Sequence, residues 1–443
     1  MHGMTGFARQ ATLLFIALRL GDAVNLAAGL WFVPRYVSPE EIGAVLPLSS
    51  FATFLSLPVF ALAMTVMKET AWMSARGERG KVKSLLSVVF AAMAALLAAV
   101  LAAGTIALPR FLAAMRVSDM SAGMLVVMAA FLGCAAPVYS DALQAMKRFR
   151  ALGAIEILGA LARFAAMALA MPIKPLAGYF AGQAVLPAFR IFMSVLAVRR
   201  DLSVPAEPFW NRPAARRMSV AFFAILAYQS APMLATLVEQ SVLRTCCTSA
   251  DSAGYYMASR FSDILHLLTF PLLLVAFPYT AHAAQNGEST FPYVMRCSAT
   301  ALGAAVSMAV VYLFFGNELM SLMPHGSEYL GYVQYMPWLV AITVLTACQV
   351  FYTNAEVSAG RFGFLVWFIP LHAICPAAMG AAARCGLIDS ITDVLAWAGA
   401  AALLRFVFAA SAMLRARQAY TLAPEASCKP NPRRKQLHNS RTL

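Results

Sequence analysis

The chain has 443 residues, of which 61% are hydrophobic and only 12% are charged. A soluble domain of ordinary composition is roughly 25% charged, so a water-soluble fold of this length could not hide so much apolar surface. The formal net charge of +14 would suggest a nucleic-acid partner in a soluble protein. Here the basic residues lie in short segments between apolar runs, which excludes that partner and favours a membrane protein.

Apolar runs of about 20 residues recur along the chain without alternating with a period of two, so they predict membrane-spanning helices rather than barrel strands. The first run carries Arg19, Asp22 and Asn25, which a cleavable signal peptide would not tolerate, and we expect it to be a permanent helix. The runs are 11–32, 43–67, 85–108, 122–145, 151–172, 176–198, 218–240, 254–282, 295–315, 332–353, 362–383 and 391–414.

The turns between these runs differ in charge. If the N-terminus is cytoplasmic, the turns on that side hold most of the lysines and arginines, and the opposite turns hold few. The positive-inside rule therefore predicts that both termini are cytoplasmic. The segment 415–443 lacks apolar periodicity and contains the Arg433-Arg434-Lys435 cluster. We expect a basic, disordered tail that either contacts anionic lipid or only fixes the topology.

An internal repeat divides the chain. The segments 38–58 and 249–271 share one plan, which is an acidic turn, a glycine and an apolar run that ends on proline. The matching residues are Gly43 with Gly254, Pro58 with Pro271, and Arg148 with Arg361. Because the offset is nearly constant, we predict two homologous six-helix lobes, related by an axis along the membrane normal. The predicted domains are 1–217, 218–414 and the tail 415–443.

The sequence lacks the motifs of soluble catalysis. There is no P-loop, metalloprotease helix, serine-hydrolase elbow or NAD fingerprint, and the string ARGERGK at 75–81 has Ala75 where a P-loop needs glycine. The eight cysteines are scattered without a C-x-x-C pair, so we interpret them as small apolar residues. We therefore predict that the protein is not an enzyme and holds no metal and no cofactor.

Ionisable residues inside the predicted spans are the candidates for function, because charge is costly to bury in a bilayer. Arginines outnumber acids there, which suits a water-filled cavity for an anionic solute such as a lipid-linked pyrophosphate or an acidic sugar. The candidates for a cationic cavity are Arg19, Arg163, Arg190, Arg260 and Arg405, and the candidates for ion coupling are Asp22, Asp141, Glu156 and Asp263.

These candidates also have structural interpretations. Two arginine–aspartate combinations, Arg19/Asp22 and Arg260/Asp263, are three residues apart and can neutralise each other on one helix face, with or without a role in transport. The other three arginines have no acid three or four residues away, so their partners come from other helices, water or an anionic ligand. Arg190 and Arg405, which occupy matching places in the two lobes, can instead extend their side chains to the lipid headgroups. His266 is expected to be packed and neutral.

The sequence resembles the polysaccharide-exporter (O-antigen flippase, Wzx-like) branch of the multidrug/oligosaccharidyl-lipid/polysaccharide (MOP) transporter superfamily. Four stretches carry the resemblance: RYVSPEEIGAVLPLSSF at 35–51 followed by the basic loop 68–83, LQAMKRFRALG at 143–153, the segment 253–281, and NAEVSAGRFG at 354–363. The resemblance implies a flippase of the bacterial cytoplasmic membrane. It would move an undecaprenyl-pyrophosphate-linked oligosaccharide across by alternating access, with H⁺ or Na⁺ as the coupling ion if there is one and polysaccharide-assembly proteins as possible partners.

Other functions remain open at this point. The MATE branch of cation-coupled multidrug exporters often has an acid on the first helix, and Asp22 fits, but a pocket for cationic drugs should be more acidic than this interior. The peptidoglycan-precursor flippases usually have fourteen helices. A membrane glycosyltransferase or polymerase should have a long outer loop with catalytic residues, which is absent from the sequence. A structural role in assembly is the remaining alternative.

Overall fold

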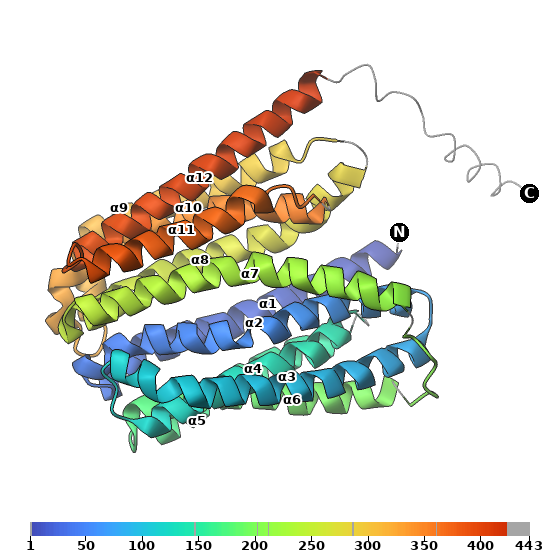
Figure 1. The fold of residues 1–443 in the computed structure, drawn as a ribbon, viewed down its shortest axis with the longest axis horizontal. Helices are drawn as coiled ribbons and strands as arrows, with labels where there is room; N and C mark the ends of the chain where they lie inside the picture. The colour runs from blue at the N-terminus through green and yellow to red at the C-terminus, as the bar shows by residue number, and fades with distance from the viewer. Residues whose placement is uncertain are drawn as a thin grey trace, which may run out of the picture.

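The computed structural model describes residues 2–145, 148–201, 203–210, 212–285, 288–359 and 361–422. In these ranges nearly the whole chain is helical (Figure 1). The elements are α1 (His2–Tyr36), α2 (Pro39–Ala75), α3 (Arg79–Ala114), α4 (Met120–Ala145), α5 (Phe149–Ala170), α6 (Pro175–Asp201), α7 (Arg212–Cys246), α8 (Ser249–Gln285), α9 (Phe291–Ser321), the 3-10 helix η1 (Gly326–Tyr335), α10 (Met336–Ser358), α11 (Leu365–Arg384) and α12 (Ile391–Leu422).

Each of the twelve predicted runs falls on its own α-helix, the tenth beginning in η1. Within the described residues, ten helices are long and apolar enough to cross a membrane. The two α-helices outside this set, α1 and α8, each carry an arginine and an aspartate three residues apart. The chain is therefore a multi-pass membrane protein, as its composition predicts.

Most of the helices are longer than the predicted runs. The basic loop expected at 68–83 is mostly helical, because α2 continues to Ala75 and α3 begins at Arg79. A helix satisfies its own backbone N–H and C=O groups, so it continues until a residue breaks it. Here the break is Gly77, whose φ of 76° lies in the left-handed region that glycine adopts readily. Likewise α12 continues to Leu422, so the first part of the predicted disordered tail, 415–422, is helical.

The helices pack in two lobes with the same pattern. In the N-terminal lobe α4 packs against α2, α3 and α6, while α5 packs against α1 and α6. In the C-terminal lobe the helices six places later repeat this, with α10 against α8, α9 and α12, and α11 against α7 and α12. The repetition confirms the predicted architecture of two pseudo-symmetric six-helix lobes.

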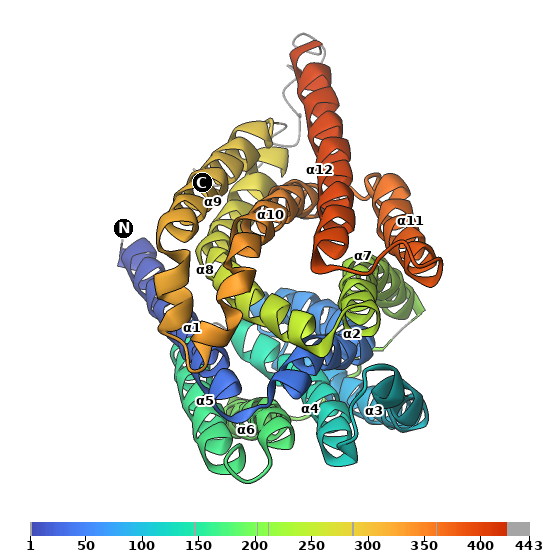
Figure 2. The ribbon, with the colours of Figure 1, turned by 90° about the vertical axis from the view of Figure 1, so that its left-hand side faces the viewer.

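The lobes meet along a seam formed by few helices. Helix α2 packs against α7 and α8, and α1 packs against α8. Viewed end-on, α2 and α7 lie side by side where the two lobes meet (Figure 2). The start of α1 and the end of α12 lie toward one end of the bundle (Figure 1). We call the opposite end, which holds the α1–α2 and α7–α8 turns, the far end.

The apolar core crosses the seam at the far end. One buried cluster unites the C-terminal lobe with the N-terminal lobe's far-end half, where it includes Val45 and Leu108. A second cluster fills the other half of the N-terminal lobe and includes Met73 and Leu85. Among the described residues, the C-terminal lobe contributes only Met218 to this second cluster. Apolar packing thus joins the lobes chiefly at the far end.

Candidate functional site

A cavity of about 540 Å³ lies at the seam. Its wall comes from α1, α2, α4, α5 and α6 of the N-terminal lobe, and from α8 of the other lobe. Helix α5 contributes Arg163, while α8 contributes Tyr256, Arg260, Asp263 and His266. Because both lobes contribute to the wall, any movement of one lobe against the other changes the cavity.

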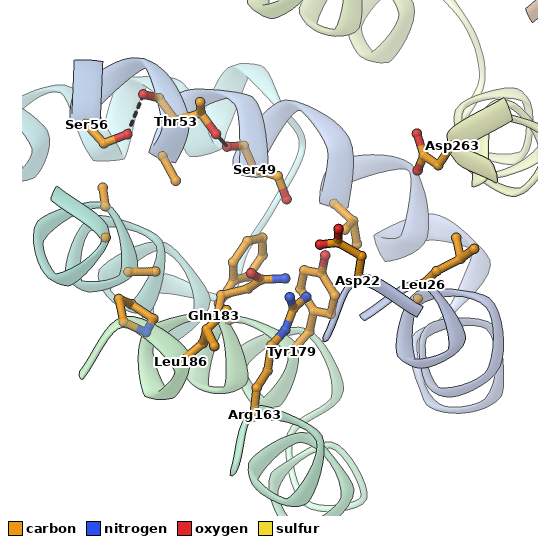
Figure 3. Close-up of a pocket in the computed structure, with 18 of the residues that line it drawn as sticks. Asp22, Leu26, Ser49, Thr53, Ser56, Arg163, Tyr179, Gln183, Leu186 and Asp263 are labelled. Atoms are coloured by element: carbon orange, nitrogen blue, oxygen red, sulfur yellow. Dashed lines mark hydrogen bonds between the residues drawn. The ribbon is translucent and has the colours of Figure 1, made fainter. Parts of the chain in front are cut away.

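The polar side chains of the cavity converge from different helices. Figure 3 shows Arg163 extending from α5 past Tyr179 toward Gln183 and Asp22. Ser49 on α2 also lines the cavity, and its buried hydroxyl has no hydrogen-bond partner among the described residues. The cavity therefore offers hydrogen-bond donors to a polar ligand as well as charge.

Three ion pairs border the cavity. Arg19 contacts Asp22 at 2.9 Å, and Arg260 contacts Asp263 at 3.0 Å. These are the two pairs predicted from the three-residue spacing. The third pair joins Arg190 of α6 to Glu156 of α5. Arg19 also donates to the backbone oxygen of Leu267 across the seam, at 3.3 Å. Three of the four arginines near the cavity are thus neutralised by carboxylates.

Arg163 is the cavity arginine that no described carboxylate neutralises. Its side chain is buried, with 9% of the residue exposed, and it makes no hydrogen bond or ion pair with any described residue. Its neighbours by charge and polarity are Tyr179, Tyr256 and two other arginines, Arg190 and Arg260. Its Nε is buried without a hydrogen-bond partner, no described carboxylate neutralises the guanidinium, and an unpaired charge is costly in a membrane interior. Among the described side chains, the cavity carries one surplus positive charge.

The other candidates lie as follows. Arg163, Arg190, Arg260, Asp22 and Asp263 line the cavity, while two pair with residues of its wall, Arg19 with Asp22 and Glu156 with Arg190. The side chain of Asp141 lies outside the described part of the chain. The prediction that His266 is packed was wrong, because α8 turns it toward the cavity on the same side as Asp263, which leaves the imidazole exposed. Its neutral state stays a prediction.

Arg405 is in a different place. The hypothesis of one shared cavity placed it with Arg190, but among the described residues it is not part of the cavity wall. It lies on α12 of the C-terminal lobe, where its Nε donates to the backbone oxygen of Ala401 at 3.0 Å. The cavity lies on the N-terminal side of the seam, so a matching position in the other lobe does not reach it. Near Arg405, the hydroxyl of Tyr255 donates a hydrogen bond to the carboxylate of Glu239 at 3.0 Å.

Sequence reasoning missed several polar residues of the wall, including Tyr179, Gln183 and Tyr256. Aromatic residues in a membrane span usually serve in packing or face lipid, and Gln183 stands alone in an apolar run. The signal that could have found Tyr179 and Gln183 is their helical spacing with Arg190 on α6, which puts all three on one face.

No protein-family model and no curated protein sequence matches the chain. Among solved structures, the chain is similar to an inward-facing conformation of a multidrug resistance MATE family transporter of the MOP superfamily. The TM-score is 0.74 at 13% identity, over 94% of this chain and 99% of that one. An outward-facing conformation of a MATE family transporter gives 0.65 at 15% identity, over 94% and 96%. A MATE structure in the straight conformation gives 0.61 at 14%, over 93% and 96%.

At these identities the similarity establishes the fold. The chain has the fold of MATE family transporters of the MOP superfamily, over most of its length. The polysaccharide-exporter branch, suggested by the sequence, stays a prediction.

Proposed function

We propose that the chain is a transporter of the bacterial cytoplasmic membrane that moves an undecaprenyl-pyrophosphate-linked oligosaccharide between the leaflets for polysaccharide export. The two lobes rock around the cavity at the seam. The observation that carries the proposal is the guanidinium of Arg163, which lines that cavity and has no counter-ion among the described residues.

An anionic ligand suits the charge balance of the cavity. Each neighbouring arginine already faces a carboxylate. Among the described side chains a cationic ligand would therefore meet one surplus positive charge, whereas a phosphate would neutralise it. Arginine binds phosphate oxygens through charge-assisted, often bidentate hydrogen bonds. Arg163 would hold the pyrophosphate, while Gln183 and Tyr179 would bind sugar hydroxyls next to it.

The size of the cavity limits what it encloses. A volume of about 540 Å³ is that of a drug-sized group. The cavity would hold the pyrophosphate and the first sugars, while the apolar lipid tail stays in the bilayer. The remaining sugars would extend out of the cavity.

Transport rather than catalysis is supported by the fold, because the similar structures are transporters captured in inward-facing and outward-facing conformations. Two packed lobes that share a cavity across a narrow seam allow such a change without unfolding either lobe. Coupling to H⁺ or Na⁺ would use the partly exposed carboxylates of Asp22 and Asp263, which are 42% and 34% exposed.

A second candidate is a cation-coupled multidrug exporter. Asp22 of the first helix lines the cavity, and the similar structures are described as multidrug resistance transporters. In that case an aspartate released from its arginine would bind the drug. The two functions differ in the sign of the ligand charge, so a binding experiment separates them.

The test measures binding to the purified protein in detergent, with undecaprenyl pyrophosphate, undecaprenol and the lipophilic cation ethidium as probes. We expect only the pyrophosphate to bind tightly, and Arg163→Gln to weaken that binding by about 10- to 100-fold, the loss of one charge-assisted contact. Arg405→Gln, outside the cavity wall, is the matched control and should bind normally. Tight ethidium binding that Asp22→Asn abolishes would instead favour the drug exporter.

A further inference from the structure

Two reciprocal hydrogen bonds join the lobes at the far end. The Nε of Arg244 donates to the backbone oxygen of Met115 at 2.9 Å, and Nη2 of Arg116 donates to the backbone oxygen of Thr245 at 3.1 Å. Met115 and Arg116 follow α3 in one lobe, while Arg244 and Thr245 lie in the last turn of α7 in the other. Each arginine therefore caps the end of a helix in the opposite lobe. We call these four residues the arginine latch.

Helix ends explain why arginine suits both positions. The last four carbonyl groups of an α-helix have no partner within the helix, and the helix dipole places partial negative charge there. A guanidinium satisfies the carbonyl and neutralises that charge. Arg244 does so in a buried position, since only 2% of the residue is exposed.

The backbone at Arg116 indicates that its side chain matters. The N–H groups of Arg116 and Val117 donate to the carbonyls of Ala113 and Leu112, which is the Schellman ending of a helix. The φ of Arg116 is 55°, in the left-handed region that usually selects glycine. An arginine at this position has a strained backbone, and its side-chain hydrogen bond to the backbone of Thr245 offsets that cost.

The surroundings of the latch are closely packed. A Cβ added to Gly43 on α2 would lie 2.4 Å from the Cβ of Ser252 on α8, and 3.0 Å from Nη1 of Arg244. Ser252 is fully buried at this crossing. The apolar core is also continuous across the seam here. Parting the lobes at the far end must therefore break the latch and expose Ser252.

We propose that the arginine latch holds the far end shut and breaks each time the lobes part there, so that its strength sets how often the cavity opens at that end. The inference rests on the transporter part of the proposed function, and not on the identity of the substrate. It assigns Arg116 and Arg244 to the conformational cycle rather than to ligand binding.

The test uses Ser252→Cys as a reporter in a chain whose native cysteines are replaced by alanine. The rate of labelling by a water-soluble maleimide is measured on the purified protein in nanodiscs. The test variant is Arg116→Gly, which removes the latch side chain while giving the turn the residue that its backbone favours, so folding is not at risk. The control is Arg110→Gln on α3, an exposed arginine with no hydrogen bond to a described side chain.

We expect Arg116→Gly to accelerate labelling by about tenfold, the factor for losing one hydrogen bond from a charged donor, and Arg110→Gln to leave the rate unchanged. Equal rates in all three chains would overturn the latch, as would equal acceleration by both variants, which would reflect charge alone. The readout needs no substrate. Its failure therefore leaves the proposed function standing, and a failed binding test leaves the latch standing.

Discussion

Two arginines of the cavity should respond in opposite ways to the same substitution. Arg163 is buried and has no counter-ion in the part of the chain that the structure describes, whereas Arg190 is paired with Glu156. Arg163→Gln removes an uncompensated charge, and we expect the free energy of unfolding to rise by about 1–3 kcal/mol. Arg190→Gln instead leaves Glu156, whose side chain is only 10% exposed, without its partner.

The magnitude for Arg190→Gln follows from burial. Breaking a fully buried ion pair costs about 3–5 kcal/mol, but the Arg190 side chain is 32% exposed, so water screens part of the interaction. We expect a loss of about 1–3 kcal/mol. The double variant Glu156→Gln/Arg190→Gln should recover most of this loss, because no charge is then left unpaired.

The assay is unfolding by SDS titration in mixed micelles, with transport measured on the same variants. Arg163→Gln should be more stable but inactive, as expected when a destabilising buried charge is needed for function. Arg163→Lys keeps the charge and should retain part of the activity. The reasoning is refuted if Arg163→Gln is less stable than the parent chain, because Arg163 would then have a partner that stabilises the fold.

Three further predictions concern other parts of the chain. Asp22→Asn should leave Arg19 without its carboxylate and remove any dependence of transport on a H⁺ or Na⁺ gradient, which transport into vesicles with an imposed gradient would reveal. Gly326→Ala should lower the free energy of unfolding by about 2 kcal/mol or more, because a Cβ there would lie 1.8 Å from the backbone oxygen of Met320. Gly331→Ala in the same 3-10 helix meets nothing within 4 Å and should be neutral in the same SDS titration.

Much of the fold could be predicted because the bilayer permits few alternatives. An apolar run of about 20 residues must satisfy its backbone internally, so each run became a helix. The ends were less predictable, since helices extend beyond the apolar core until a breaker such as Gly77. The repeat predicted two lobes because equivalent sequences pack in equivalent ways, as α4 and α10 do.

The ion pairs of the site could be predicted only where they join neighbours along one helix. The pairs of Arg19 with Asp22 and of Arg260 with Asp263 follow from the helical period. The partner of Arg190 comes from another helix, and the sequence carries no signal for which helices face each other. For the same reason Arg405 was grouped with a cavity that lies on the other side of the seam.

The most direct test of the account is to deplete the protein from cells and quantify undecaprenyl-linked oligosaccharide on the inner leaflet, with tolerance to cationic drugs measured in parallel. The account predicts that full-length lipid-linked oligosaccharide accumulates while drug tolerance is unchanged, and that Arg163→Gln fails to reverse the accumulation. Sensitivity to cationic drugs without accumulation would contradict it and identify a drug exporter.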